Sequence, residues 1–236
     1  MSRTAAVLFV LTSHGQLGET GKSTGFWLAE AAHPWRVFTD AGHRVELVSV
    51  QGGRSPIDGA DLSDPVQREF LDRVDLAAAR PVADADPADY RAVLYVGGHG
   101  AMWDFPGNPA VTRLGTEIHA AGGVVAAVCH GPAGLLDIRV PDGSHLLAGK
   151  DVTSFSNAEE AKIGMTPVLP FLLQTALEQR GARHQDAGIF APRVVVDGRL
   201  VTGQNPPSSA GVAREVIRLL EDRSGPASLP GPEAAG

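Results

Sequence analysis

Apolar runs of strand length recur along the chain and predict the strands of one sheet. The runs near the N-terminus, in the middle and before Cys129 are uninterrupted, which is typical of parallel strands covered on both faces. Polar residues and turn signals separate them, and Asp197-Gly198 fits the turn of a hairpin. The expected strands are 5–11, 44–50, 92–96, 123–128, 151–154 and the hairpin arms 193–196 and 200–201.

Helical patterns alternate with these strands. Thr24 is expected to cap the first helix, and Pro34 is expected to kink or restart it. In that helix Phe26, Glu30, His33 and Val37 share one face, so Glu30 points where apolar residues point. Alternation of this kind predicts a three-layer α/β/α sandwich with a mainly parallel central sheet, whose ligands bind beyond the carboxyl ends of the strands. The expected helices are 24–40, 65–74, 108–121, 167–180 and 206–221.

One α/β domain is expected over residues 1–222. Residues 51–91 are rich in Gly, Pro and Asp, which indicates a long surface excursion that covers the active site. Residues 223–236 are rich in Pro, Gly, Ala and Ser, and a disordered tail is expected there.

Charge and composition indicate which kinds of molecule the protein is expected to bind. The 236 residues carry a formal net charge of −7, and the basic residues are scattered singly, so neither nucleic acid nor an anionic membrane is an expected partner. No apolar run approaches the roughly 18 residues of a membrane span, and no signal-peptide cleavage pattern is visible. A cytoplasmic protein that acts on a small molecule is therefore expected.

Cys129, the single cysteine, is the first candidate for chemistry. It follows the most apolar strand and precedes Pro132, which suits the first turn of a helix. A turn of this kind presents the sulfur beside backbone N–H groups and a positive helix end, and so favours a thiolate. The alternative interpretation is a buried structural cysteine.

Three acidic residues and one histidine complete the candidates. His130 needs an orienting acid to act as a base, and the residues alone do not decide between Glu159 and Glu160, which also fit a solvated first helical turn. Glu30 is expected to have a raised pKa, because a carboxylate on an apolar helix face is costly to ionise; the alternative is that Pro34 turns it outward.

Backbone N–H groups at the two glycine-containing turns are candidates for an oxyanion hole. They belong to Gly98 and His130, where glycine allows close approach to a developing negative charge. The segment Gly97-Gly98-His99-Gly100 matches neither nucleotide-phosphate fingerprint.

Five segments together resemble the ThiJ/PfpI superfamily, specifically its branch of glutathione-independent glyoxalase III and heat-shock chaperone proteins. The resemblance covers nearly the whole domain and implies a flavodoxin-like, class I glutamine amidotransferase-like fold. The segments are 24–34 around Glu30, 97–106 from Gly97 to Pro106, 126–133 around Cys129, 152–160 ending at Glu160, and 197–206 from Asp197 to Pro206.

The resemblance implies a nucleophilic Cys129, its neighbour His130, Glu160 as the third member and Glu30 as a carboxyl in contact with the sulfur. Gly98, His99 and Trp103 are expected to bind the oxyanion or substrate. The implied enzyme is a lyase of the hydro-lyase class that detoxifies methylglyoxal or glyoxal to D-lactate or glycolate through a hemithioacetal and an enediol. It needs no cofactor or metal, and a cytoplasmic homodimer linked to stress response is expected.

Other functions remain open. His184-Gln185-Asp186 resembles the His-x-acid order of triad-type glutamine amidotransferases, which share this sheet. A holdase-type stress chaperone or protein deglycase is a second alternative, with Cys129 as a redox sensor. A third is a tailoring enzyme or hydratase for a larger substrate, in which Trp27, Trp103 and Phe105 shape the cavity.

Overall fold

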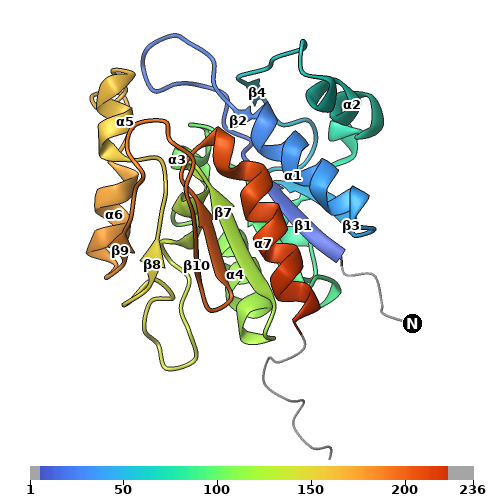
Figure 1. Ribbon diagram of the computed structural model, residues 1–236. Helices are drawn as coiled ribbons and strands as arrows, with labels where there is room; N and C mark the ends of the chain where they lie inside the picture. The colour runs from blue at the N-terminus through green and yellow to red at the C-terminus, as the bar shows by residue number, and fades with distance from the viewer. Residues whose placement is uncertain (1–5, 223–236) are drawn as a thin grey trace, which may run out of the picture.

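A computed structural model describes residues 6–222, and Figure 1 shows its central sheet between helices. Seven strands form this sheet. The strand order is β10-β11-β7-β6-β1-β3-β5, and every neighbouring pair is parallel except the hairpin β10–β11. The expected sandwich with a mainly parallel sheet is confirmed. The strands are β1 (Ala6–Leu11), β3 (Arg44–Ser49), β5 (Arg80–Pro81), β6 (Ala92–Tyr95), β7 (Val124–Val128), β10 (Val194–Asp197) and β11 (Leu200–Gly203).

The apolar runs are continuous because the sheet is buried on both faces. Along β1, Leu8 and Val10 belong to one hydrophobic core, whereas Val7, Phe9 and Leu11 belong to a second core on the opposite face. Successive side chains of a strand point to opposite faces, so a strand between two cores has no polar face.

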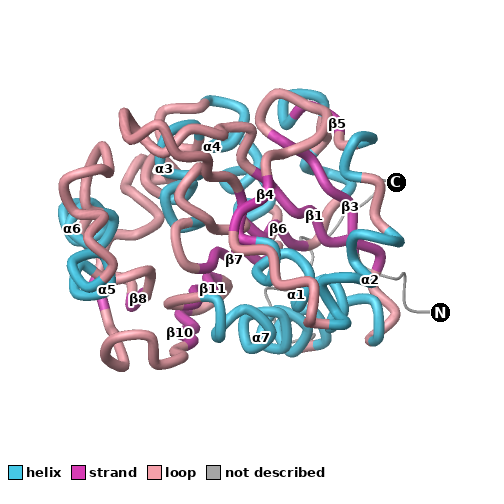
Figure 2. The backbone as a smooth tube through the Cα atoms, turned by 90° about the horizontal axis from the view of Figure 1, so that it is seen from above, coloured by secondary structure: helices cyan, strands magenta, loops and turns pink. Residues whose placement is uncertain are grey.

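Two groups of helices supply the outer layers, and Figure 2 shows them on either side of the strands. The face of α1 and α7 also carries α2, while α4 and α6 contribute buried residues to the other core. The short helix α5 stands at the rim beside α6. The helices are α1 (Leu28–Asp40), α2 (Pro65–Arg73), α3 (Ala101–Asp104), α4 (Pro109–Ala120), α5 (Asn157–Lys162), α6 (Leu173–Gln179) and α7 (Ser209–Glu221).

Short elements complete the fold. Two small parallel pairs lie outside the main sheet, β2 with β4 and β8 with β9. Their bounds are β2 (Phe26–Trp27), β4 (Ile57–Asp58), β8 (Asp151–Val152) and β9 (Arg183–His184). The 3₁₀ helices are η1 (Leu76–Ala78), η2 (Val82–Asp84), η3 (Pro87–Asp89), η4 (Gly131–Leu135) and η5 (Pro206–Ser208).

The first helix begins four residues later than expected. The amide of Phe26 donates to the carbonyl of Pro56 and that of Trp27 to Gly97, so both residues stay extended. Thr24 caps no helix, because its hydroxyl donates to Asp58. Pro34 neither ends nor restarts α1. Burial of the helix against the sheet offsets the cost of proline, which is about 3 kcal/mol.

Two other elements are shorter than the sequence pattern indicates. The helix expected over 167–180 is confined to α6 because residues 165–172 form turns, and the strand expected over 151–154 is only β8, paired with β9. No helix within residues 6–222 is long and apolar enough to cross a membrane. The expected tail at 223–236 lies outside the described residues, and the domain boundary at residue 222 stays a prediction.

Candidate active site

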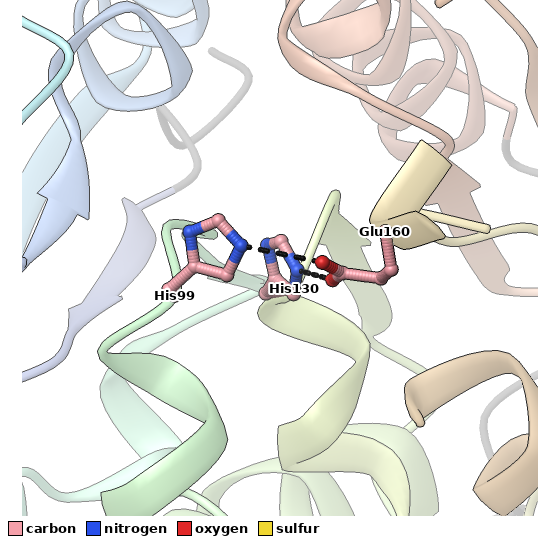
Figure 3. Close-up of side chains that lie close together, drawn as sticks. All are labelled: His99, His130 and Glu160. Atoms are coloured by element: carbon pink, nitrogen blue, oxygen red, sulfur yellow. Dashed lines mark hydrogen bonds and ion pairs between the residues drawn. The ribbon is translucent and has the colours of Figure 1, made fainter. Parts of the chain in front are cut away.

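The candidate residues meet at the carboxyl ends of β6 and β7, which are neighbours in the sheet. Gly98 and His99 follow β6, and Cys129 and His130 follow β7. Because parallel strands end at the same edge, the two turns lie side by side there. Figure 3 shows His99, His130 and the side chain of Glu160 converging at this point.

Cys129 lies in a strained turn between β7 and the 3₁₀ helix η4. Its φ of 58° is unusual for any residue other than glycine. The turn is fixed on both sides, since the Cys129 amide donates to Gly203 and its carbonyl accepts from Phe155, both at 2.9 Å. A cysteine held in this way points its sulfur toward the rim, as in a nucleophile elbow.

The space around this turn requires glycine at two positions. A Cβ on Gly131 would lie 2.0 Å from the carbonyl oxygen of Tyr95. Gly98 has a φ of +106°, and a Cβ there would lie 2.4 Å from the carbonyl oxygen of Gly25. The two turns therefore pack against backbone at distances that no side chain permits.

His130 links the sulfur to a carboxylate. Its Nδ1 lies 3.3 Å from Sγ of Cys129, and its Nε2 lies 2.5 Å from Oε1 of Glu160. All three residues are buried, and the ring of Phe155 packs 4.9 Å from that of His130. The structure therefore brings together the cysteine, histidine and acid proposed from the sequence.

Cys129, His130 and Glu160 form a hydrogen-bonded relay, and Glu160 carries its negative charge. Burial by itself would raise the pKa of Glu160, but the hydrogen bond from His130 and the nearby imidazole of His99 lower it to about 2. Burial and the charge of His99 lower the pKa of His130 to about 4, against the opposing effect of Glu160. At neutral pH the imidazole is thus neutral, its Nε2–H donates to Glu160, and its Nδ1 faces the sulfur as an acceptor.

The choice between the two acids is decided by the tertiary structure. Glu159 accepts from the amide and hydroxyl of Ser156 and also from Phe190 and Asn205, so its carboxylate holds three segments together. Its neighbour Glu160 faces His130 instead. Neither acid is solvated, contrary to the alternative that placed both on an exposed helical turn.

Glu30 is a second acid beside the sulfur. It is fully buried in the first turn of α1, which rules out the outward orientation considered above. Burial raises its pKa to about 8, and the neighbouring Cys129 side chain and Gly97 backbone oppose this rise in part. The expected uncharged acid beside the sulfur is therefore present at neutral pH.

The expected resting thiolate does not agree with the structure. Burial raises the pKa of the Cys129 thiol well above its ordinary value. The helix that follows is only the five-residue 3₁₀ helix η4, so it offers little of the positive end that was expected. The resting residue is a thiol, and its proton has an acceptor at Nδ1 of His130.

The proposed oxyanion donors are unpaired. Within residues 6–222, the amide N–H groups of Gly98 and His130 donate to no other protein group. Both residues line the pocket. They are therefore free to hold an oxygen that gains negative charge.

The pocket above the sulfur has a volume of about 300 Å³ and is mainly apolar. Sequence reasoning missed much of its wall, namely Phe155, Ile163, Phe190 and residues 205–207. No local pattern identifies these residues, because they come from separate segments after β7. The lining consists of Trp27, Gly98, His99, Cys129, His130, Phe155, Ile163, Phe190, Asn205, Pro206 and Pro207.

Several expected wall residues lie elsewhere. Trp103 stacks on His14 with ring centroids 5.0 Å apart, and Phe105 is buried against Tyr95. The excursion 51–91 contributes no lining residue. Its helix α2 packs on α1, and its strand β5 extends the sheet beyond β3. The segment approaches the pocket through the β2–β4 pair.

The alternative histidine is engaged outside the pocket. Nε2 of His184 accepts from the amide of Ser154 at 3.1 Å, and His184 does not line the pocket. The position facing the sulfur is filled by His130. The amidotransferase-like arrangement is therefore not formed.

Comparison with known proteins gives consistent results. The sequence model of the DJ-1/PfpI family matches residues 23–219. Glyoxalase 3 of Candida albicans is 32% identical over 231 residues, covering 91% of this chain and 98% of that protein. Glutathione-independent glyoxalase HSP31 of Saccharomyces cerevisiae is 31% identical over 234 residues, covering 92% and 98%.

Solved structures show the same fold. Rapid Encystment Protein 24 KDa of Francisella tularensis has a TM-score of 0.89 at 34% identity, covering 92% of this chain and all of that one. Glyoxalase III of Candida albicans has a TM-score of 0.83 at 31% identity, covering 92% and 97%. The family match spans most of the chain, and the chain belongs to the DJ-1/PfpI family.

Proposed function

We propose that the protein is a glutathione-independent glyoxalase that converts a 2-oxoaldehyde to a 2-hydroxy acid, methylglyoxal to D-lactate being the simplest case. The relay from Cys129 through His130 to Glu160, in which Cys129 and His130 line the apolar pocket, is the observation that carries the proposal. The names of the curated relatives support it.

The first step activates the sulfur only when substrate is present. The thiol proton passes to Nδ1 of His130, and the imidazolium that forms is stabilised by the Glu160 carboxylate. The sulfur adds to the aldehyde carbon, and the carbonyl oxygen becomes an alkoxide held by the amides of Gly98 and His130. His130 then gives its proton to this oxygen, which yields a neutral hemithioacetal.

The second step moves hydrogen between adjacent carbons. A base removes the proton from C1, an enediol forms, and C2 is reprotonated. C1 is thereby oxidised to a thioester while C2 is reduced from ketone to alcohol, so the two-electron changes balance without an external acceptor. Water then hydrolyses the thioester, releasing the 2-hydroxy acid and restoring the Cys129 thiol.

Glu30 is the acid of this cycle that rests in the protonated state. We assign it the exchange of protons with the sulfur and the enediol oxygens, because its carboxyl is buried beside Cys129. We assign removal of the C1 proton to His130, whose Nδ1 faces the sulfur.

Replacement of the nucleophile tests the proposal directly. Cys129→Ala and Cys129→Ser should lose turnover of methylglyoxal in the absence of glutathione, because no hemithioacetal forms on the protein. Methylglyoxal consumption and D-lactate formation are measured, and circular dichroism shows that the fold is kept. Turnover at the wild-type rate by either folded variant would refute the proposal.

Glu160 and its neighbour Glu159 allow a test of the relay with a matched control variant. Glu160→Gln should lower kcat by about 10²- to 10⁴-fold, because the amide neither fixes the tautomer of His130 nor stabilises the imidazolium. Glu159→Gln, one residue away, should mainly lower thermal stability, since its contacts are structural. Equal losses of kcat in the two folded variants would contradict the assigned role of Glu160.

A further inference from the structure

Three potential metal ligands converge at the pocket, and two of their atoms have no hydrogen bond. One ring nitrogen of His99, one ring nitrogen of His130 and a carboxylate oxygen of Glu160 lie within 4.8 Å of one another. Nε2 of His99 is 3.5 Å from Oε2 of Glu160, too far for a hydrogen bond, and both atoms are buried without a hydrogen-bond partner among residues 6–222. The proposed reaction uses Oε1 of Glu160 and leaves this second oxygen unused.

We propose that His99, His130 and Glu160 form a zinc site, and that Zn²⁺ bound there inhibits the enzyme. Two imidazoles and one carboxylate, with a further position open to the pocket, are a ligand set that zinc accepts. The side chain of His99 is 13% exposed and lines the pocket, so an ion reaches the cluster through the pocket.

The geometry is close to that of a bound ion. Ligand atoms that share a zinc ion at about 2.0–2.1 Å in a tetrahedral site lie roughly 3.4 Å apart. His130 and Glu160 have to separate slightly from 2.5 Å, while His99 has only to move inward. Figure 3 shows the rings of His99 and His130 lying next to each other. Their centroids are 4.2 Å apart.

The same cluster explains why the ion would inhibit. Zinc on Nε2 of His130 takes the lone pair of that nitrogen, and the ring proton then resides on Nδ1. No net proton is released, but Nδ1 no longer accepts the proton of the Cys129 thiol. Zinc also removes Glu160 from its hydrogen bond. This consequence rests on the proposed function, whereas binding of the ion does not.

Binding is measured first, without substrate, by competition of Zn²⁺ with a chromogenic chelator on the metal-free full chain. One ion per chain is expected. His99→Asn and Glu160→Gln should each weaken binding by at least about tenfold, because each removes a ligand. His33→Asn is the matched control. It removes a histidine that also pairs with a carboxylate, Asp64, outside the site, and should leave affinity unchanged.

The variant Cys129→Ser tests whether zinc binds to the Cys129 thiol instead of to the proposed site. It keeps all three ligands, so its zinc affinity should equal that of the wild type. Co²⁺ in the wild-type chain gives an independent measurement that depends on no variant: d–d absorption is expected without the strong sulfur-to-cobalt charge-transfer band. Loss of zinc affinity in Cys129→Ser, or a sulfur band with Co²⁺, would overturn the proposal.

The activity measurement follows on the same samples. Zinc should inhibit wild-type methylglyoxal turnover at concentrations that match its binding, and a chelator should restore the rate. Tight binding without inhibition would overturn the inhibitory part. A protein that binds zinc as expected but never turns over methylglyoxal would refute the proposed function and leave the site intact.

Discussion

Single residues carry the chemistry of this protein through their protonation states. Cys129 and Glu30 retain their protons because both are buried, whereas Glu160 stays ionised because His130 donates to it and the imidazole of His99 lies beside it. The sequence indicates Cys129, His130 and Glu30 by their positions in the pattern. Protonation depends on which groups face one another, and the sequence pattern does not show the burial that raises the pKa of the sulfur.

A pH dependence of stability follows from Glu30. Its pKa is raised from 4.5 to about 8 in the folded protein, so between these values the folded state holds one more proton than the unfolded state. Below pH 4.5, the pKa of Glu30 in the unfolded state, its full contribution to the free energy of unfolding is present. That contribution falls by about 1.4 kcal/mol per pH unit as the pH rises toward about 8, the pKa of Glu30 in the folded state. Glu30→Gln does not titrate and should lack this fall.

Urea unfolding of Glu30→Gln and wild type between about pH 5 and pH 8 checks this expectation. The stability of the variant relative to wild type should rise by a few kcal/mol across the range. The shifted titration of His130 is common to both proteins and cancels in the difference. A difference that is constant with pH would show that Glu30 titrates normally in the folded state.

At the scale of elements, the site depends on a very short helix. Helix α5 has six residues, and its capping box joins Ser156 to Glu159 immediately before Glu160. Such a short helix has little stability of its own, so its cap and its packing fix the position of the Glu160 carboxylate. The sequence segment matches the family, but its role as a capped helix is visible only in the fold.

Ser156→Ala should therefore affect both stability and catalysis. Loss of the cap costs about 1 kcal/mol, and kcat should fall because Glu160 is held less firmly against His130. Asn108→Ala is the matched control, since Asn108 caps α4, whose residues do not line the pocket. Thermal unfolding and kcat are measured for both variants. A similar loss of kcat in Asn108→Ala would indicate general destabilisation instead of a local effect.

At the scale of the whole molecule, the pocket is assembled from segments far apart in the chain. Its apolar wall includes Phe155, Ile163 and Phe190, and Phe190 has a φ of 58° that turns it toward this region. A volume of about 300 Å³ is far larger than methylglyoxal requires. The apolar space favours 2-oxoaldehydes that carry a larger apolar group.

A comparison of kcat/KM for phenylglyoxal and methylglyoxal measures how much the apolar wall contributes to binding the larger substrate. Phe190→Ala should lower kcat/KM for phenylglyoxal by about tenfold, because burial of an aromatic group contributes roughly 1–3 kcal/mol, and should lower it less for methylglyoxal. Leu62→Ala replaces another exposed apolar residue, which does not line the pocket, and should change neither value. An unchanged ratio of the two kcat/KM values in Phe190→Ala would contradict the expectation.

The sequence alone determined the layers and the rim of the site. Apolar runs buried on both faces require a covered parallel sheet, and such a sheet brings the turns at Gly98 and Cys129 to one edge. The tertiary structure alone decided which carboxylate faces His130, where Trp103 lies and which residues form the pocket wall. Local patterns record the burial and turns of neighbouring residues, whereas facing contacts and protonation depend on segments that meet only after the chain has folded.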